Sequence, residues 1–233
     1  MNTGQTVFTQ VIARVPHWEF RRAYSACDLA MPRSNALSAW DHFLALCFAQ
    51  MTFRRSLRDI EACLRAQPGL AYHMGFRSAI TRSSLARANE QRAWQPWAHV
   101  AGKLIAKARL LYQDEPRAID WDVPVIAVDS SLIDLSLALC PWANYTGSKA
   151  ALKLHAGLDL QGPIPAFVNV TTATDSDMGY LDMMPIEPGT LYVMDRGYID
   201  FRRLRRLADH GAFFVIRARP DVRFYVAASR PVD

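Results

Sequence analysis

The spacing of apolar residues changes near the middle of the chain. Over residues 1 to 115, apolar side chains recur every three or four positions with almost no alternation, which is typical of helices. From Ser38 to Gln50, Ala39, Phe43 and Leu46 fall on one side, and further apolar residues flank them. This pattern predicts a helix that is apolar over much of its circumference and central to its domain.

Capping and breaking residues predict where the next helices begin and end. Ser56, with Asp59 three residues later, predicts the start of a short amphipathic helix, and Pro68 with Gly69 predicts its end. Ser83 is the next candidate for a helix N-cap.

Pro96 should interrupt the helical pattern that follows Ser83. The prediction is one helical piece that ends near Trp94 and a second piece from Trp97 to Tyr112. Gln113 to Pro124 is polar and bracketed by prolines, which indicates a domain boundary.

Beyond that boundary the pattern becomes that of strands. The runs that predict strands are 125–128, 153–160, 165–173, 191–194 and 213–217. Gln161 and Gly162 predict a tight hairpin between the second and third strands, and helices are expected at 177–184 and 201–210. The expected architecture is α/β, with an all-helical domain at 1–115 and a mixed β-sheet with flanking helices at 120–233.

Composition indicates a globular protein with a basic surface. Of the 233 residues, 51% are hydrophobic and 21% charged, and the formal net charge is +5, which favours an acidic partner such as nucleic acid. Arg77, Arg82, Arg87 and Arg92 are spaced by fives in a segment that loosely resembles a helix-turn-helix DNA reader. The alternative is that these arginines form only a solvated face.

Cysteine usage and the N-terminus predict a cytoplasmic protein. The cysteines at 27, 47, 63 and 140 form no CxxC pair, so neither a zinc knuckle nor a redox motif is expected. The first 15 residues lack the basic and apolar regions of a secretory signal, and no apolar run has the length of a membrane span.

Two aspartates follow apolar runs of the β type. Asp129 directly follows the run VIAV, and Asp195 directly follows the run LYVM. Both aspartates are therefore expected at strand ends. Two neighbouring carboxylates repel unless a cation compensates them, and oxygen ligands suit magnesium or manganese. The alternative is that each aspartate caps the element that follows, as Asp129 could do before Ser130 and Ser131.

Several blocks of the sequence resemble bacterial DDE transposases of the insertion-sequence-four branch. These blocks are IAVDSSLIDL, KLHAGLDLQGPIPAFVNVTTATDSD and LYVMDRGYIDFRRL, and the helical leader of one group of these proteins is similar to DHFLALCFAQMTFRRSLRDIEACLRAQPGLAYHMGF and RSSLARANEQRAW. The resemblance covers nearly the whole chain. It implies an RNase H-like core, in which the first and fourth strands lie side by side and bring Asp129 and Asp195 together.

By this resemblance, Asp129 and Asp195 are catalytic and metal-binding residues, the first two members of an acidic triad that holds two Mg²⁺ or Mn²⁺ ions for phosphoryl transfer. The partner would be double-stranded DNA at transposon ends. A homodimer is expected by analogy, because two ends must be paired.

Other basic residues are candidates for DNA contact. Arg196 could contact a phosphate or pair with a nearby carboxylate. Lys149, Lys153 and His155 could contact phosphates or serve as solvated charges at a sheet edge.

Acidic residues near the end of the third strand have a simpler expected role. Asp175 and Asp177 lie in the loop after that strand, where they are expected to stabilise a turn.

The family's third acidic residue is a glutamate on a later helix. After Phe213 the sequence has only Asp221 and Asp233 as acids, so we expect a truncated transposase. The alternative is a catalytically inactive DNA-binding remnant or an inhibitor of the full-length transposase. An aspartate-nucleophile hydrolase is disfavoured, because VDSS lacks a second aspartate two residues after Asp129.

Overall fold

A computed structural model describes residues 5–32, 37–112, 122–135, 143–147, 149–160, 162 and 164–223. The chain divides into two compact units, Met1–Leu104 and Ile105–Asp233. The division falls before the boundary expected near residue 115, within a helix that continues to Tyr112. Cys140, Gln161 and the segment 113–121 lie outside the described residues.

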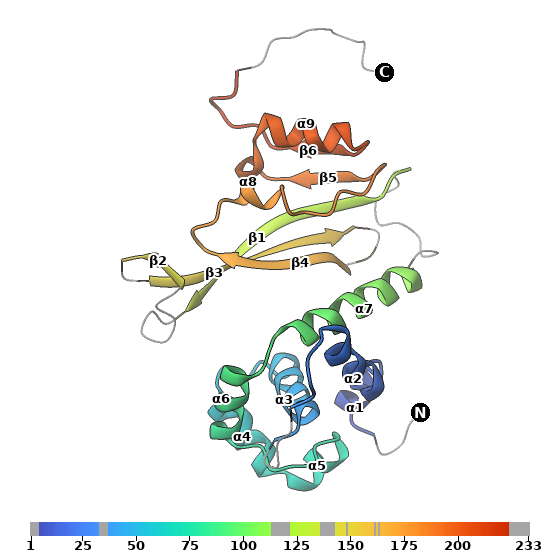
Figure 1. The fold of residues 1–233 in the computed structure, drawn as a ribbon, viewed down its shortest axis with the longest axis vertical. Coiled ribbons are helices and arrows are strands. Elements are labelled where there is room, and N and C mark those ends of the chain that lie inside the picture. The colour runs from blue at the N-terminus through green and yellow to red at the C-terminus, as the bar shows by residue number, and fades with distance from the viewer. Residues whose placement is uncertain are drawn as a thin grey trace. The chain divides into compact units, whose positions relative to one another are not determined.

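The first unit is helical, as predicted. Its helices are α1 (Val7–Ile12), α2 (His17–Ala26), α3 (Ala39–Met51), α4 (Leu57–Ala66), α5 (Pro68–His73), α6 (Arg82–Gln91) and the first part of α7 (Gln95–Tyr112) (Figure 1). Phe20, Leu44 and Leu85 are fully buried at its centre. The predicted central helix is therefore confirmed as α3.

Side-chain caps fix the helix starts. Ser38 accepts a hydrogen bond from the Asp41 N–H at the start of α3, and Ser56 accepts one from Asp59 at the start of α4. The cap predicted at Ser83 is wrong. Thr81 caps α6 instead, because its hydroxyl accepts from Ser84 N–H while the Ser84 hydroxyl accepts from the Thr81 N–H.

Prolines act partly as expected. α6 ends at Gln91 and α7 begins at Gln95, so the predicted interruption exists, with Pro96 in the first turn of the new helix. Pro68 ends α4 but also begins α5, since a proline at the first helical position loses no intrahelical hydrogen bond.

The second unit is a mixed α/β structure. Its strands are β1 (Val125–Leu135), β2 (Asn144–Thr146), β3 (Lys149–Asp159), β4 (Ile164–Thr172), β5 (Leu191–Met194) and β6 (Phe213–Ile216). They form one sheet in the order β2-β3-β1-β5-β6, with β4 also paired to β3. β1 is antiparallel to β3 and parallel to β5, and β5 is parallel to β6. All five predicted strands are present, and β2 was not predicted.

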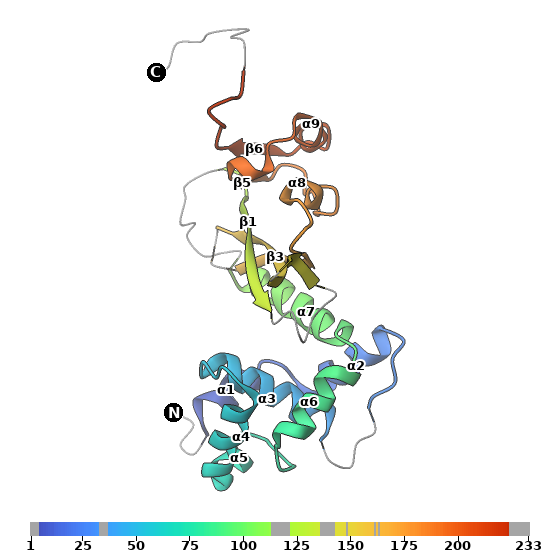
Figure 2. The same ribbon diagram turned by 90° about the vertical axis from the view of Figure 1, so that its left-hand side faces the viewer.

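Helices α8 (Asp177–Tyr180) and α9 (Phe201–Asp209) lie on the same side of this sheet (Figure 2). Leu204 and Leu207 of α9 pack with Tyr192 and Ile126 of the sheet in a buried core. Among the described residues, no helix is both long and apolar enough to cross a membrane.

Two glycines should respond oppositely to the same substitution. Gly211, just after α9, has φ of 73°, whereas Gly102 is exposed in the interior of α7, where an added Cβ would have no neighbouring heavy atom within 4 Å. We predict that Gly211→Ala lowers the free energy of unfolding by about 1 kcal/mol, because an L side chain is strained at this φ.

Gly102→Ala should raise the free energy of unfolding by about 0.5–1 kcal/mol, since alanine restricts the unfolded chain. Urea unfolding followed by circular dichroism measures both changes. If both variants changed the free energy of unfolding by the same amount in the same direction, Gly211 would not have its positive φ of 73°.

Candidate functional site

The register of two parallel strands places Asp129 and Asp195 at neighbouring positions. Val125 to Val128 of β1 pair in order with Leu191 to Met194 of β5. Asp129 and Asp195 are the residues that directly follow these paired stretches of β1 and β5, and both are exposed. Neighbouring strands lie about 4.8 Å apart, so the two carboxylates leave the sheet close together.

The prediction that Asp129 lies at a strand end is wrong. β1 continues to Leu135 because β3 pairs with it over this whole stretch, from Asp129 with Ala156 to Leu135 with Ala150. What ends after Val128 is the pairing with β5. Asp129 therefore lies where β1 loses one neighbour, and it caps no helix.

Asp195 does cap the element that follows it. Its Oδ1 accepts a hydrogen bond of 2.7 Å from the N–H of Gly197 at the start of the 3₁₀ helix η2 (Arg196–Tyr198). A Cβ on residue 197 would lie 2.9 Å from that oxygen and 3.7 Å from Oδ2 of Asp177. Glycine at this position thus lets the Asp195 carboxylate approach the backbone closely, while the distance to Asp177 is an ordinary van der Waals contact.

A polar network adjoins the two aspartates. The Ser130 hydroxyl donates to Oδ1 of Asp177 at 2.7 Å, and Nζ of Lys153 lies 3.2 Å from the same oxygen. Lys153 also donates to the carbonyl of Asp175 at 2.7 Å. Asp177 therefore joins α8 to β1 and β3, which corrects the turn role expected for it. Asp175 does stabilise a turn, because its side chain accepts from the Thr172 N–H.

Tyr198 lies behind this cluster with 1% of its surface exposed. Burial raises the pKa of Tyr198 well above its usual value, and the negative charges of Asp177, Asp129 and Asp195 act in the same direction. All three carboxylates are thus within electrostatic range of one phenol, which remains neutral. Among the described residues, however, no three histidine, cysteine or acidic side chains are grouped closely enough to hold a metal ion.

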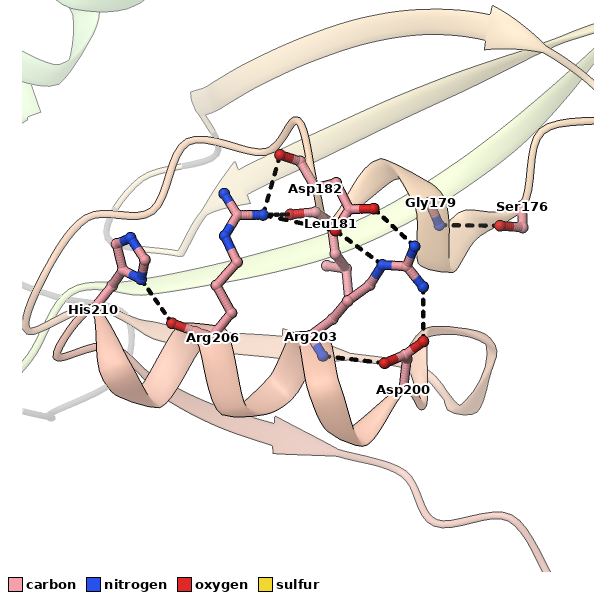
Figure 3. Close-up of polar contacts among 8 residues, drawn as sticks. All are labelled: Ser176, Gly179, Leu181, Asp182, Asp200, Arg203, Arg206 and His210. Atoms are coloured by element: carbon pink, nitrogen blue, oxygen red, sulfur yellow. Dashed lines mark hydrogen bonds and ion pairs between the residues drawn. The ribbon is translucent and has the colours of Figure 1, made fainter.

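Arginines hold the segments around the cluster. Arg203 of α9 donates to Asp182 after α8 and to Asp200 before α9, and Arg206 donates to the carbonyls of Leu181 and Asp182 (Figure 3). The Arg203 guanidinium lowers the pKa of the Asp182 carboxyl. These arginines thereby attach the loop after α8 to α9.

A further clamp lies at the other end of the strands. Nη1 and Nη2 of Arg109 on α7 donate to the two carboxylate oxygens of Glu187 at 3.0 and 3.1 Å. Its Nε is also 3.5 Å from Oδ2 of Asp159 at the end of β3. This bidentate pair lowers the pKa of Glu187 and attaches the end of α7 to the strands. Sequence reasoning missed it because the partners are far apart in the chain.

The predicted basic contacts differ in their availability. Lys149 and Arg196 are exposed, and neither forms an ion pair with another described residue. Lys153 is engaged by Asp177. In the first unit Arg82 and Arg87 are exposed on α6, and Arg77 lies beyond α5 with its guanidinium over the Tyr72 ring.

His155 cannot contact a phosphate in this structure. Its side chain is fully buried, its Nε2 lies 2.9 Å from the Thr171 hydroxyl, and its ring stacks on Tyr180 with centroids 4.2 Å apart. Burial lowers its pKa below the ordinary 6.5. The alternating pattern of β3 predicted that His155 could lie at an accessible sheet edge. It could not show that Tyr180 of α8 covers the His155 ring.

We predict that His155 makes the second unit less stable in mild acid. Because its folded pKa is lowered, the unfolded chain takes up a proton below pH 6.5 that the folded chain excludes, so stability falls as the pH drops from 6.5 towards the folded pKa. His155→Phe keeps a ring against Tyr180 but binds no proton. Hydrogen exchange of β3 amides, corrected for intrinsic rates, should lose less protection between pH 7 and pH 5.5 in this variant.

His42→Phe is the matched control, because His42 is also buried and has a lowered pKa but lies in the first unit. It should leave the pH dependence of the β3 amides unchanged. An identical loss of β3 protection in the wild type and in His155→Phe would show that His155 does not cause it.

Comparison with known proteins gives two family matches. Residues 3–77 match the model described as "Domain of unknown function (DUF4372)", and residues 120–231 match that described as "Transposase DDE domain". The second match contains the strands and the aspartates described above.

Two curated proteins are similar to the chain. "Putative transposase y4zB" of Sinorhizobium fredii is 28% identical over 148 residues, which are 64% of this chain and 40% of that protein. "Probable transposase for insertion sequence element IS5377" of Geobacillus stearothermophilus is 29% identical over 109 residues, 47% of this chain and 29% of that protein. The chain thus spans less than half the length of these relatives.

Proposed function

We propose that this chain acts as an insertion-sequence transposase of the DDE class, which cuts and joins DNA strands at transposon ends. The observation that carries the proposal is the strand register, which makes Asp129 and Asp195 neighbours at the edge of the β1–β5 pairing. The match of residues 120–231 to the transposase DDE domain and the names of the two relatives support it.

We also propose that the second unit is RNase H-like and belongs to the insertion-sequence-four branch. The strand connections support the fold: β1, β3 and β4 are consecutive antiparallel neighbours, and β5 and β6 then join the opposite side of β1 in parallel. This order follows the expected arrangement of three antiparallel strands and a parallel extension. It brings one aspartate from each half of the sheet to the same place.

The donor set at this place fits a divalent cation. Asp129 and Asp195 are both exposed residues, and among the described contacts only Oδ1 of Asp195 accepts a hydrogen bond, from the Gly197 N–H. Carboxylate oxygens are the ligands that Mg²⁺ and Mn²⁺ prefer. A bound Mg²⁺ or Mn²⁺ would increase the acidity of a water or a 3′-hydroxyl and stabilise charge on the departing oxygen. Asp129 and Asp195 would hold the ion, with water completing its coordination.

The protein's own groups give this site a fixed geometry. The Gly197 N–H orients Asp195 through its hydrogen bond to Oδ1. Buried, neutral Tyr198 lies within electrostatic range of the carboxylates and adds no charge of its own to the site. The exposed Arg196 would bind a phosphate of the DNA strand next to the reacting bond.

DNA would also contact basic residues outside this centre. Lys149 is exposed on β3, and Arg82 and Arg87 are exposed on α6, so they can bind phosphates without breaking a structural ion pair. Lys153 would have to give up Asp177, so its contribution to the DNA contact would be smaller. We propose that the chain acts as a homodimer, since two transposon ends must be brought together.

A second candidate is a DNA-binding protein that does no chemistry. It is favoured by one observation: the described residues contain no group of three acidic or other metal-binding side chains. In that case the basic residues would bind DNA while the two aspartates held a single ion too weakly for cleavage. Metal-dependent nicking of DNA by this chain would exclude the second candidate.

We predict that Asp129→Asn and Asp195→Asn each weaken Mn²⁺ binding by at least about tenfold, because each removes a charged ligand. Both should fold, since Asp129 is exposed and an asparagine at 195 can still accept from Gly197. Titration of Mn²⁺, followed by the electron paramagnetic resonance signal of the free ion, measures the affinity.

Asp134→Asn is the matched control, because Asp134 is an exposed aspartate further along β1. It should leave the Mn²⁺ affinity unchanged. The same affinity in the wild type and in both the Asp129 and Asp195 variants would refute the metal site.

A further inference from the structure

The first unit contains a surface cavity of about 350 Å³ whose walls are both apolar and basic. It lies between the end of α4, the helix α5 and the segment that follows α5. Its floor is formed by the buried side chains of Leu64, Phe76 and Ile80. Its rim carries Arg65, Tyr72 and Arg77, all of them exposed.

Arg77 is held in place before any ligand arrives. Its guanidinium carbon lies 4.4 Å from the centroid of the Tyr72 ring, and its Nη1 donates to the carbonyls of Tyr72 and Phe76 at 3.1 and 3.3 Å. Its Nε and Nη2 donate to no other described residue. Two donors of a fixed guanidinium thus remain available for an anion, and little side-chain entropy is lost on binding.

The backbone beneath this arginine is fixed as well. The buried carboxylate of Asp41 accepts a 3.0 Å hydrogen bond from the Arg77 N–H and a 2.6 Å hydrogen bond from the Ser78 hydroxyl. Both oxygens of the Asp41 carboxylate thus accept a hydrogen bond, one from the Arg77 backbone and one from the Ser78 side chain. The ion pair between Arg65 and Glu61 is loose, with 4.0 Å between Nη1 and Oε1, and the Arg65 side chain is 76% exposed. Such an exposed pair is weak, so Arg65 is also free to contact a ligand.

The chemistry of the walls selects the ligand. A phosphate alone would use the arginines and leave the apolar floor empty, whereas an apolar molecule would leave the arginines unused. A nucleotide uses both, because its base has an apolar face that stacks on aromatic and guanidinium planes and its phosphate accepts from arginine. The volume lies in the range of cavities that hold small organic ligands.

We propose that this cavity receives one unstacked nucleotide of DNA, with the base over the apolar floor beside Tyr72 and the phosphate on Arg77 and Arg65. The proposal rests on the proposed action of the chain on DNA, but the cavity is separate from Asp129 and Asp195. The cavity would give the first unit a preference for DNA in which one base is free to leave the helix.

The test compares two fluorescent duplexes of the same sequence, one fully paired and one with a single bulged adenosine. Binding to the full chain is measured by fluorescence anisotropy in EDTA, so that no metal-dependent cleavage occurs. We expect the bulged duplex to bind about tenfold more tightly, the effect of stacking one base on an aromatic platform.

Two variants of the cavity should remove this preference. Arg77→Ala removes the fixed guanidinium, and Ala79→Trp fills the cavity from an exposed position that lines it. Arg58→Ala is the matched control, because Arg58 is an exposed arginine of α4 that does not line the cavity. It should weaken both duplexes equally and keep the tenfold difference. Circular dichroism checks that each variant is folded.

The outcomes separate the two proposals. If the wild type binds both duplexes equally, or if Ala79→Trp is folded and keeps the preference, the cavity does not take a nucleotide, while the proposed action on DNA stands. If the wild type binds neither duplex, both proposals fail. Loss of the preference in both cavity variants and its retention in Arg58→Ala would support the cavity site.

Discussion

The candidate site exists because β1 pairs in parallel with β5 in one register. Four consecutive residue pairs, from Val125 with Leu191 to Val128 with Met194, fix where the pairing between these two strands ends. A shift of one residue would turn the side chains of one strand to the opposite face of the sheet. The register therefore makes Asp129 and Asp195 neighbours where the β1–β5 pairing ends, although they lie far apart in the chain.

Charge pairs hold the surroundings of this pairing in place. Asp177 joins α8 to β1 through Ser130 and to β3 through Lys153. Arg203 ties α9 to the loop after α8, and Arg109 ties the end of α7 to Glu187 before β5. These acids are compensated by basic partners, whereas no basic side chain among the described residues forms an ion pair with Asp129 or Asp195. That difference supports the proposal that a cation binds between the two aspartates at the β1–β5 edge.

Local features of the structure follow from the sequence, and features set by distant contacts do not. β5 is predicted at its observed bounds because an apolar run of four residues lies between a turn and an aspartate. The Ser56 cap also follows from neighbouring residues. The length of β1 depends on β3, and the burial of His155 depends on Tyr180, so neither could be inferred from periodicity. The cavity beside Arg77 needs three segments to come together, which no single motif indicates.

Diffraction from a crystal soaked in Mn²⁺, with anomalous data collected near the manganese absorption edge, would show directly whether Asp129 and Asp195 bind a metal. We predict an anomalous peak within coordination distance of carboxylate oxygens from both aspartates. A well-ordered β1–β5 edge without such a peak, or a peak only at other carboxylates, would contradict the assignment of these two aspartates as a metal site.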